Sequence, residues 1–161
     1  MATWQAFAAA APSLADRVRK RFTSAESHIL ATLRRDGSPR VSGSEVDFRD
    51  GSLYVGSMLD AVKARDLRRD GRFAIHAAPG DPAAGGDAKL AGVATEVTDP
   101  ALLARIQGGG EPSHLFHLDI REAALTWVEG NTLFVESWQE GKGLVRFARP
   151  DNGPAIRTEL D

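Results

Sequence analysis

Cysteine is missing from all 161 residues of this sequence. A disulfide framework, a cysteine-ligated zinc site, an iron–sulfur cluster and a cysteine nucleophile are therefore excluded together. Long hydrophobic runs are missing too: the nearest, residues 6–11, ends at Pro12 and falls well short of the ~20 residues that span a membrane. The first residues also lack the basic start and long apolar region of an export signal. We therefore expect a cytoplasmic protein with no membrane partner.

Several motifs of nucleotide-binding and hydrolytic enzymes are absent as well. No Gly-x-Gly-x-x-Gly follows a predicted strand, and neither a phosphate-binding Gly-Lys-Ser/Thr loop nor a Gly-x-Ser-x-Gly elbow occurs. Charge of one sign is not in large excess, because 20 basic residues are balanced by 22 acidic ones. Residues 1–72 carry 13 basic and 9 acidic groups, so an anion-binding site is expected in that half. An excess this small does not indicate a nucleic-acid partner.

The composition is that of one ordinary globular domain. It is 42% hydrophobic and 26% charged, and a chain of this length buries roughly 70% of its unfolded surface. No linker, repeat or low-complexity segment divides the chain, so we expect residues 1–161 to form a single domain. A pocket that encloses a large cofactor is hard to build from one chain of this size.

The hydrophobic period alternates along the chain between two and about 3.6 residues, the strand and helix values. An amphipathic helix is predicted over residues 13–25, with Ser13 as its N-cap, and Asp-Gly pairs at 36–37 and 50–51 predict hairpin turns. Further strands are predicted at 29–33, 40–48, 53–55, 73–77, 89–97, 116–128 and 132–138, and further helices at 61–70, capped by Asp60, and at 100–106. The tail from residue 142 is predicted to be polar and partly irregular. This order favours a mainly β (α+β) antiparallel barrel with six or seven strands and disfavours a Rossmann fold.

Three polar residues between positions 30 and 78 suggest an anion site. Ser57 lies where the third strand ends, Lys63 stands in the first turn of the next helix, and Arg40 lies on the neighbouring strand. A helix start offers free backbone N–H groups and the positive end of the helix dipole. These groups could converge on a phosphate. Spacing alone leaves open the alternative of a solvated helix whose basic residues pair with neighbouring acidic ones.

The histidines do not indicate a metal centre. His114 and His117 have the spacing of metal ligands, but no carboxylate cluster completes a site, so surface or interface histidines are favoured. His76 lies opposite the apolar face of its predicted strand and is interpreted as a structural polar contact. We therefore predict that no metal is bound.

Three segments form an ordered pattern. They read Ile-Leu-Ala-Thr-Leu-Arg-Arg-Asp-Gly-Ser-Pro-Arg-Val-Ser at 29–42, Asp-Gly-Ser-Leu-Tyr-Val at 50–55 and Lys-Ala-Arg-Asp-Leu-Arg-Arg-Asp-Gly-Arg-Phe-Ala at 63–74. The pattern resembles the pyridoxamine 5'-phosphate oxidase-like proteins, and it covers residues 14–98 best. Gly71 departs from it, because many relatives have Pro in that turn. The resemblance implies an antiparallel split β-barrel of the FMN-binding type and a homodimer with its cofactors at the subunit interface.

The resemblance also implies which residues bind the cofactor. Lys63 matches the family's phosphate-binding lysine after the third strand. Arg40, Val41 and Ser42 match the strand that runs along the ring and ribityl chain of the cofactor. Ser57 and Met58 match the strand end near the phosphate. Trp138 and Arg146 match the part of the pocket that the other subunit completes.

The expected function is therefore that of a small oxidoreductase in which FMN or coenzyme F420 passes hydride to or from an unidentified organic substrate. The sequence does not decide between the two cofactors and assigns no catalytic residue. One alternative is a non-catalytic flavin or haem carrier of the same fold. A less favoured alternative is an OB-like barrel for single-stranded nucleic acid, since strands 40–48 and 53–55 offer only Phe48 and Tyr54 as stacking platforms.

Overall fold

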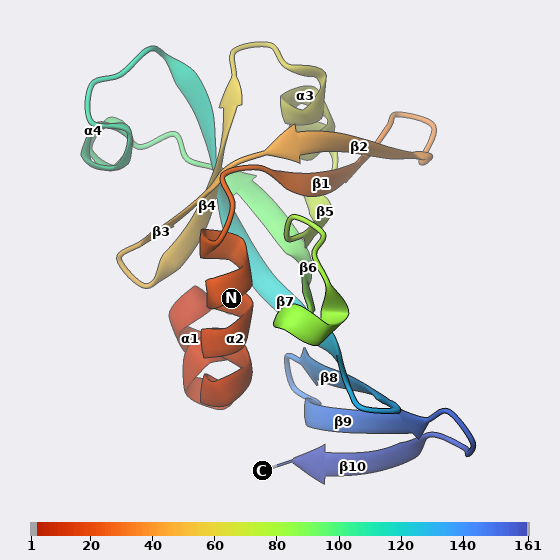
Figure 1. Cartoon of the computed structure of the whole chain (residues 1–161). Coiled ribbons are helices and arrows are strands. Elements are labelled where there is room, and N and C mark those ends of the chain that lie inside the picture. Colours follow the sequence, from red (N-terminus) through yellow and green to blue (C-terminus); the bar gives the residue numbers. More distant parts are fainter. Residues whose placement is uncertain (1–2, 161) are drawn as a thin grey trace.

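The computed structural model describes residues 3–160, and Figure 1 shows the path of the chain. Within those residues it contains four α-helices, one short 3-10 helix and ten strands. The helices are α1 (Trp4–Ala10), α2 (Pro12–Thr23), α3 (Val62–Arg69), η1 (Pro82–Ala84) and α4 (Pro100–Gln107). The strands are β1 (His28–Leu33), β2 (Pro39–Ser44), β3 (Val46–Arg49), β4 (Ser52–Met58), β5 (Arg72–His76), β6 (Asp87–Glu96), β7 (Ser113–Glu129), β8 (Thr132–Gln139), β9 (Gly143–Pro150) and β10 (Ile156–Leu160).

The strands form an antiparallel barrel, as the predicted hairpins indicate. β1 pairs with β2 and β5, β5 pairs with β6, and β6 pairs with β7. The first half of β7 also pairs with β4, which pairs with β3. The predicted strand 40–48 is divided at Glu45 into β2 and β3, so one continuous segment turns a corner of the barrel and closes the ring.

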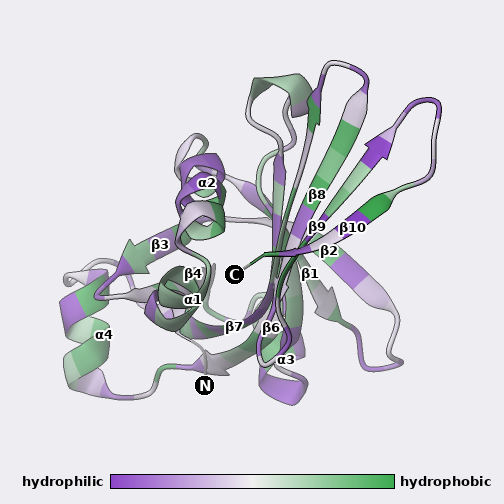
Figure 2. Ribbon diagram, turned by 90° about the horizontal axis from the view of Figure 1, so that it is seen from below, coloured by the Kyte–Doolittle hydropathy of each residue, from purple (hydrophilic) through white to green (hydrophobic). Residues whose placement is uncertain are grey.

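Three strands at the C-terminal end form an arm that extends the sheet away from the barrel. The second half of β7 pairs with β8, β8 with β9, and β9 with β10. In Figure 2 these strands carry alternating hydrophobic and hydrophilic bands. The prediction of a partly irregular tail from residue 142 is therefore wrong. Arginines interrupt the apolar residues of this segment, so its strand pattern is hard to see in the sequence. The structure shows the pattern in the pairing of β9 with β8, where Leu144 lies opposite Trp138.

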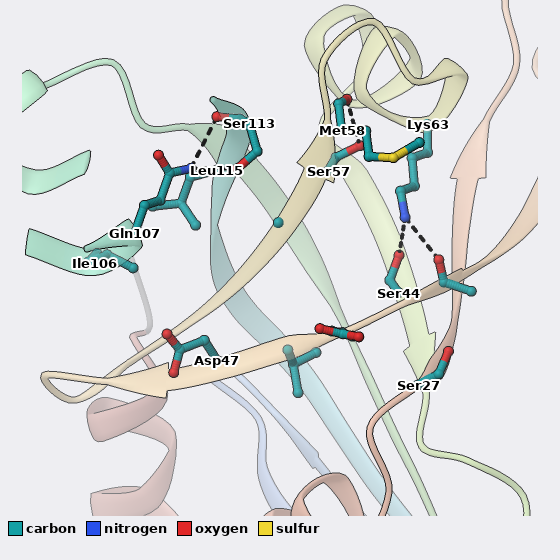
Figure 3. Close-up of a pocket in the computed structure, with 14 residues that line it drawn as sticks. Ser27, Ser44, Asp47, Ser57, Met58, Lys63, Ile106, Gln107, Ser113 and Leu115 are labelled. Atoms are coloured by element: carbon teal, nitrogen blue, oxygen red, sulfur yellow. Dashed lines mark hydrogen bonds between the residues drawn. The ribbon is translucent and has the colours of Figure 1, made fainter. Parts of the chain in front are cut away.

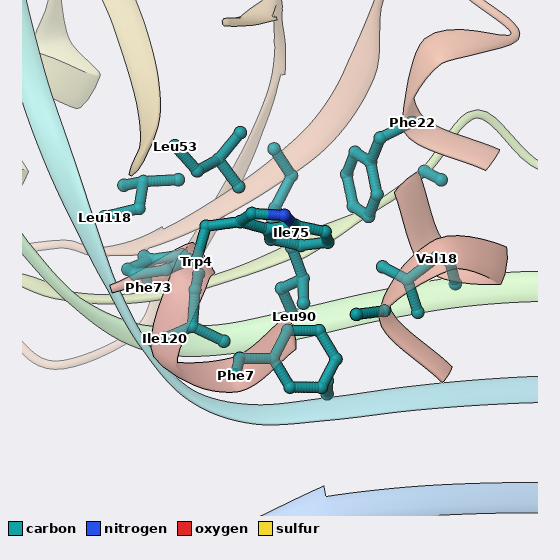
Figure 4. Close-up of a cluster of buried hydrophobic side chains, with 14 of the residues drawn as sticks. Trp4, Phe7, Val18, Phe22, Leu53, Phe73, Ile75, Leu90, Leu118 and Ile120 are labelled. Carbon is teal, nitrogen blue, oxygen red and sulfur yellow. The ribbon is translucent and has the colours of Figure 1, made fainter. Parts of the chain in front are cut away.

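Two helices close one end of the barrel and complete its core. α1 was not predicted, although Trp4, Phe7 and Ala11 lie at helical spacing and are buried. The Phe7 ring lies 4.9 Å from that of Trp138, and the Trp4 ring lies 4.7 Å from that of Phe48. Figure 4 shows Trp4 and Phe7 gathered with side chains of α2 and of the strands. None of the helices in residues 3–160 has the length and apolar character needed to cross a bilayer.

The predicted helix caps differ from those observed. α2 begins at Pro12 with Ala11 as N-cap, and no side-chain hydrogen bond from Ser13 caps it. α3 begins at Val62 with Ala61 as N-cap. Asp60 instead adopts a left-handed backbone conformation with φ of 59° in the turn before the helix. Proline at the first helical position has no backbone N–H that a cap would have to satisfy, so α2 can begin at Pro12.

Candidate functional site

A cleft of about 610 Å³ opens between the β2–β3 corner, the end of β4 and the two helices α3 and α4. Figure 3 shows that residues of α4 and β7 lie on one side of it and those of α3 and β2 on the other. Its lining residues are Ser27, Gly43, Ser44, Glu45, Val46, Asp47, Gly56, Ser57, Met58, Lys63, Ile106, Gln107, Ser113 and Leu115. The volume falls in the range of roughly 300–1,000 Å³ that is typical of small-molecule sites.

Lys63 provides the cation of this cleft. It stands in the first turn of α3, and its Nζ donates to the backbone oxygen of Gly43 and to Oγ of Ser44, both at 2.8 Å. Burial lowers the pKa of Lys63, while the nearby carboxylate of Glu45 opposes that shift. Because a lysine ammonium has three N–H donors, the two bonds fix its position and leave a third donor for an anion.

The end of β4 brings Ser57 and Met58 to the same cleft. Ser57 is buried, and its Oγ lies 3.5 Å from the backbone oxygen of Met58. The side chain of Met58 is 79% exposed, and Leu59 and Val62 beside it are also exposed. The structure therefore brings together three residues singled out in the sequence, Ser57, Met58 and Lys63, and surrounds them with apolar surface.

The opposite wall of the cleft comes from α4 and from the start of β7. Gln107 donates from Nε2 to the backbone oxygen and Oγ of Ser113, at 3.0 and 2.9 Å, and so ties the helix to the strand. Ile106 and Leu115 form an apolar floor that continues into a small cluster with Tyr54. Sequence reasoning missed this wall, because nothing local in residues 100–115 indicates where α4 packs.

The three predicted residues of β2 lie before the part of the strand that lines the cleft. The Arg40 Nε donates to Oδ2 of Asp66 at 2.7 Å, and Val41 is 69% exposed. Oγ of Ser42 is buried without a hydrogen-bond partner among the described residues. Arg40 is thus engaged by a buried carboxylate of α3 rather than directed at the cleft.

The predicted residues of the arm lie elsewhere. Trp138 is 5% exposed and packs in the chain's own core against Phe7. Arg146 donates to the buried carboxylate of Glu136 at 2.6 Å, and its guanidinium lies 6.0 Å from the ring of Trp127. Neither lines the cleft of the same chain, and a role toward a second chain stays a prediction.

The histidines occupy three different environments. His114 is buried beside Glu96, with Nδ1 2.8 Å from its Oε1, so it does not lie on the surface, which is one of the two positions that the sequence favoured. His117 is half-buried, its Nε2 lies 3.2 Å from Oγ of Ser52, and burial lowers its pKa. His76 is half-buried, with Nδ1 2.5 Å from the backbone oxygen of Ala77. Residues 3–160 hold no group of three or more histidine and acidic residues that could bind a metal ion.

Comparisons with known proteins identify the family. The family model described as pyridoxamine 5'-phosphate oxidase matches residues 14–127, which run from α2 to the second half of β7. The matched part includes the cleft and leaves out α1 and the arm. No curated protein sequence matches this chain.

Solved structures show the same fold at low sequence identity. A pyridoxamine 5'-phosphate oxidase-related, FMN binding protein from Nostoc punctiforme is 15% identical and covers 94% of this chain and 96% of its own, with a TM-score of 0.61. A heme binding protein from Mycobacterium smegmatis is 16% identical, with coverage of 89% and 90% and a TM-score of 0.54. The heme storage protein HutZ from Vibrio cholerae is 19% identical, with coverage of 70% and 90% and a TM-score of 0.51.

These likenesses confirm the predicted fold, a mainly antiparallel split β-barrel with short helices. The family match spans more than half of the chain. The chain therefore belongs to the pyridoxamine 5'-phosphate oxidase family.

Proposed function

We propose that the cleft binds a phosphate-bearing flavin, either FMN or the deazaflavin F420, and that the protein is an oxidoreductase. The observation that carries the proposal is the position of Lys63. Lys63 stands in the first turn of α3, beside the positive end of the helix dipole, and its ammonium is fixed by Gly43 and Ser44 at the end of β2. The dipole and the full charge of the lysine both favour an anion in the cleft. The FMN binding protein of the same fold supports a flavin as the ligand.

The chemistry of the cleft fits such a ligand. Its cationic end lies at Lys63, and its other wall offers the apolar side chains of Ile106 and Leu115 for a planar ring. Two carboxylates, Glu45 and Asp47, also line the cleft. Asp47 disfavours an anion along its edge of the cleft, whereas Glu45 lies near Lys63 and partly offsets the charge of the lysine.

The bound flavin would supply the hydride transfer, and the residues of this chain would bind, orient and shield it. Lys63 would hold the phosphate by a charge-assisted hydrogen bond. Ile106 and Leu115 would exclude water from one side of the ring. Gln107, fixed by Ser113, would keep its side-chain oxygen available to accept a hydrogen bond from the ring or from a substrate.

We further propose that the protein acts as a homodimer, with the second copy covering the rim of the cleft. Val41, Met58, Leu59 and Val62 are between 48% and 79% exposed. Large apolar side chains gathered on a surface usually mark an interaction site. Met58 lines the cleft, Leu59 and Val62 follow it in the chain, and Val41 lies two residues before the lining residue Gly43 on β2. A second chain that packs on these side chains would complete the walls that one chain lacks.

The test is a titration of the purified protein with FMN and with F420, followed by absorption and fluorescence. Lys63→Ala should weaken binding of the preferred cofactor at least tenfold, since a hydrogen bond to a charged group contributes about 1.5–3 kcal/mol. Lys142→Ala, in the turn between β8 and β9, is the matched control and should bind as the wild type does. Unchanged affinity in Lys63→Ala would disprove the role of the lysine.

Turnover distinguishes an enzyme from a carrier. The reduced cofactor is mixed with candidate organic acceptors, and oxidation is measured with and without the protein. An oxidoreductase accelerates oxidation by at least one acceptor, whereas a carrier binds the cofactor without doing so.

Haem is the second candidate ligand, because two proteins of the same fold are haem proteins. His76 is half-buried on the outside of the sheet, and its Nδ1 lies against the backbone oxygen of Ala77. A hydrogen bond of this kind orients the other ring nitrogen of a ligating histidine. Addition of haemin should then produce a Soret band that His76→Ala shifts or removes. A spectrum identical in wild type and variant would exclude this ligand role.

A further inference from the structure

The turn between β4 and α3 positions the polar residues of the cleft. Residues 59–61 join Ser57 and Met58 on the strand to Lys63 on the helix. Asp60 within this turn has φ of 59°, in the left-handed region that residues other than glycine adopt uncommonly and that aspartate tolerates better than most. Its backbone N–H donates to Nε2 of His114, at 3.3 Å.

The hydrogen bonds of His114 define which of its nitrogens carries the proton. Nε2 accepts from the Asp60 N–H, so it must be unprotonated. Nδ1 therefore carries the hydrogen and donates to Oε1 of Glu96 at 2.8 Å. Glu96 is itself held by two bonds of 2.7 Å from the guanidinium of Arg68. Hydrogen bonds from Arg68 keep the pKa of Glu96 below its usual range.

These contacts connect both ends of α3 to the barrel wall. Arg68 lies in the last turn of the helix, Glu96 ends β6, and His114 lies near the start of β7. His114 also stands directly opposite Ser57 in the pairing of β7 with β4. His114 thus pairs with the strand end through its backbone, and its imidazole contacts the turn and the charged pair that holds the helix.

We infer that His114 is a positioning residue, whose neutral imidazole holds the β4–α3 turn in the conformation that presents Ser57, Met58 and Lys63 to the ligand. It lies outside the lining of the cleft and acts through the Asp60 N–H. The effect on ligand affinity rests on the proposed function, whereas the effect on the turn does not.

The charged groups that face the imidazole are Glu96 from β6 and Arg68 from α3, whose Nη2 lies 3.2 Å from Nδ1. The acceptor for the Asp60 N–H is the lone pair of Nε2. A side chain that offers no acceptor at this place should therefore release the turn.

The experiment compares four full-length proteins, namely wild type, His114→Gln, His114→Phe and the control His117→Phe. The glutamine oxygen can accept the Asp60 N–H, whereas phenylalanine cannot accept it. His117 lies on the same strand but contacts Ser52 rather than the turn. The first readout is the protection of the Asp60 amide in hydrogen exchange, and the second is the affinity for FMN, both measured at about pH 8.

At pH 8, His114→Phe should lose about tenfold in Asp60 protection, and His114→Gln and His117→Phe should keep it. FMN affinity should follow the same order.

Asp60 protection in His114→Phe equal to that of the wild type would overturn the inference. If His114→Phe does not fold, His114→Leu, which also offers no acceptor, takes its place, and wild-type protection of Asp60 in that variant overturns the inference. If no protein binds FMN, the proposed ligand is wrong, and the Asp60 protection values still decide the role of His114.

Discussion

Removal of the Asp66 carboxylate should destabilise the protein strongly. This side chain is 3% exposed and accepts hydrogen bonds from Thr32 at 2.8 Å, from Arg40 at 2.7 Å and from Arg69 at 2.9 Å. A hydrogen bond to a charged group contributes about 1.5–3 kcal/mol. The arginine side chains are 23% and 33% exposed and regain water when the carboxylate is lost. The hydroxyl of Thr32 stays buried and unpaired.

We therefore expect Asp66→Ala to lower the free energy of unfolding by about 3 kcal/mol. With a denaturant slope of about 2 kcal/mol per molar urea, the midpoint of urea unfolding should fall by about 1.5 M. Asp70→Ala removes a carboxylate from the exposed pair with Arg72 at the end of the same helix and should shift the midpoint far less. Equal shifts in the two variants would refute the reasoning.

The same carboxylate should make stability depend on pH. Burial raises the pKa of Asp66, but hydrogen bonds from Arg40, Arg69 and Thr32 outweigh it and hold the pKa below its usual range. A carboxyl with a lowered folded pKa stabilises the protein above its unfolded pKa of about 3.9, and this contribution is lost as the pH falls through the folded value. Urea midpoints measured below about pH 4 should therefore decrease less in Asp66→Asn than in the wild type. Parallel decreases would contradict this role.

Three further variants test the core, the barrel and the proposed dimer. Phe7→Ala should lower the free energy of unfolding, measured in urea, by about 3–5 kcal/mol, because the ring is fully buried. A decrease of less than about 1 kcal/mol would mean that α1 does not complete the core. Gly92→Ala would place a Cβ 1.8 Å from the backbone oxygen of Asp119 and should prevent stable folding by circular dichroism, whereas Gly110→Ala meets nothing closer than 3.7 Å and should fold normally. Val41→Glu should shift sedimentation from dimer to monomer, and a wild-type profile would exclude Val41 from the interface.

The parts of the fold that follow local rules were predicted from the sequence. Asp50 and Gly51 have φ of 52° and 72°, the two left-handed positions of the tightest hairpin turn, and they join β3 to β4 as expected. The short apolar run at 29–33 likewise lies within β1, His28–Leu33, as expected. Such signals depend only on neighbours in the chain, so they do not require knowledge of the tertiary structure.

One side of the cleft was predicted because it depends on local sequence, and the other side was missed because it depends on tertiary packing. Ser57, Met58 and Lys63 come together because a short turn joins a strand end to a helix start. The wall that contains Gln107 depends on the register of β7 against β4, which no local pattern fixes. The network of His114 joins residues of three elements far apart in sequence, so it too needed the structure.

β7 determines when this barrel can form. The strand supplies the partner edge for β4 and β6 along its first part and for β8 along its second, so the ring closes only when β7 is present. α1, at the start of the chain, packs through Phe7 on Trp138 of β8. During synthesis the first helix must therefore wait for most of the chain before it reaches its native contact. Folding dominated by such distant pairings is slow, on the order of milliseconds to seconds, and the exposed strand edges stay open until residues 113–139 have left the ribosome.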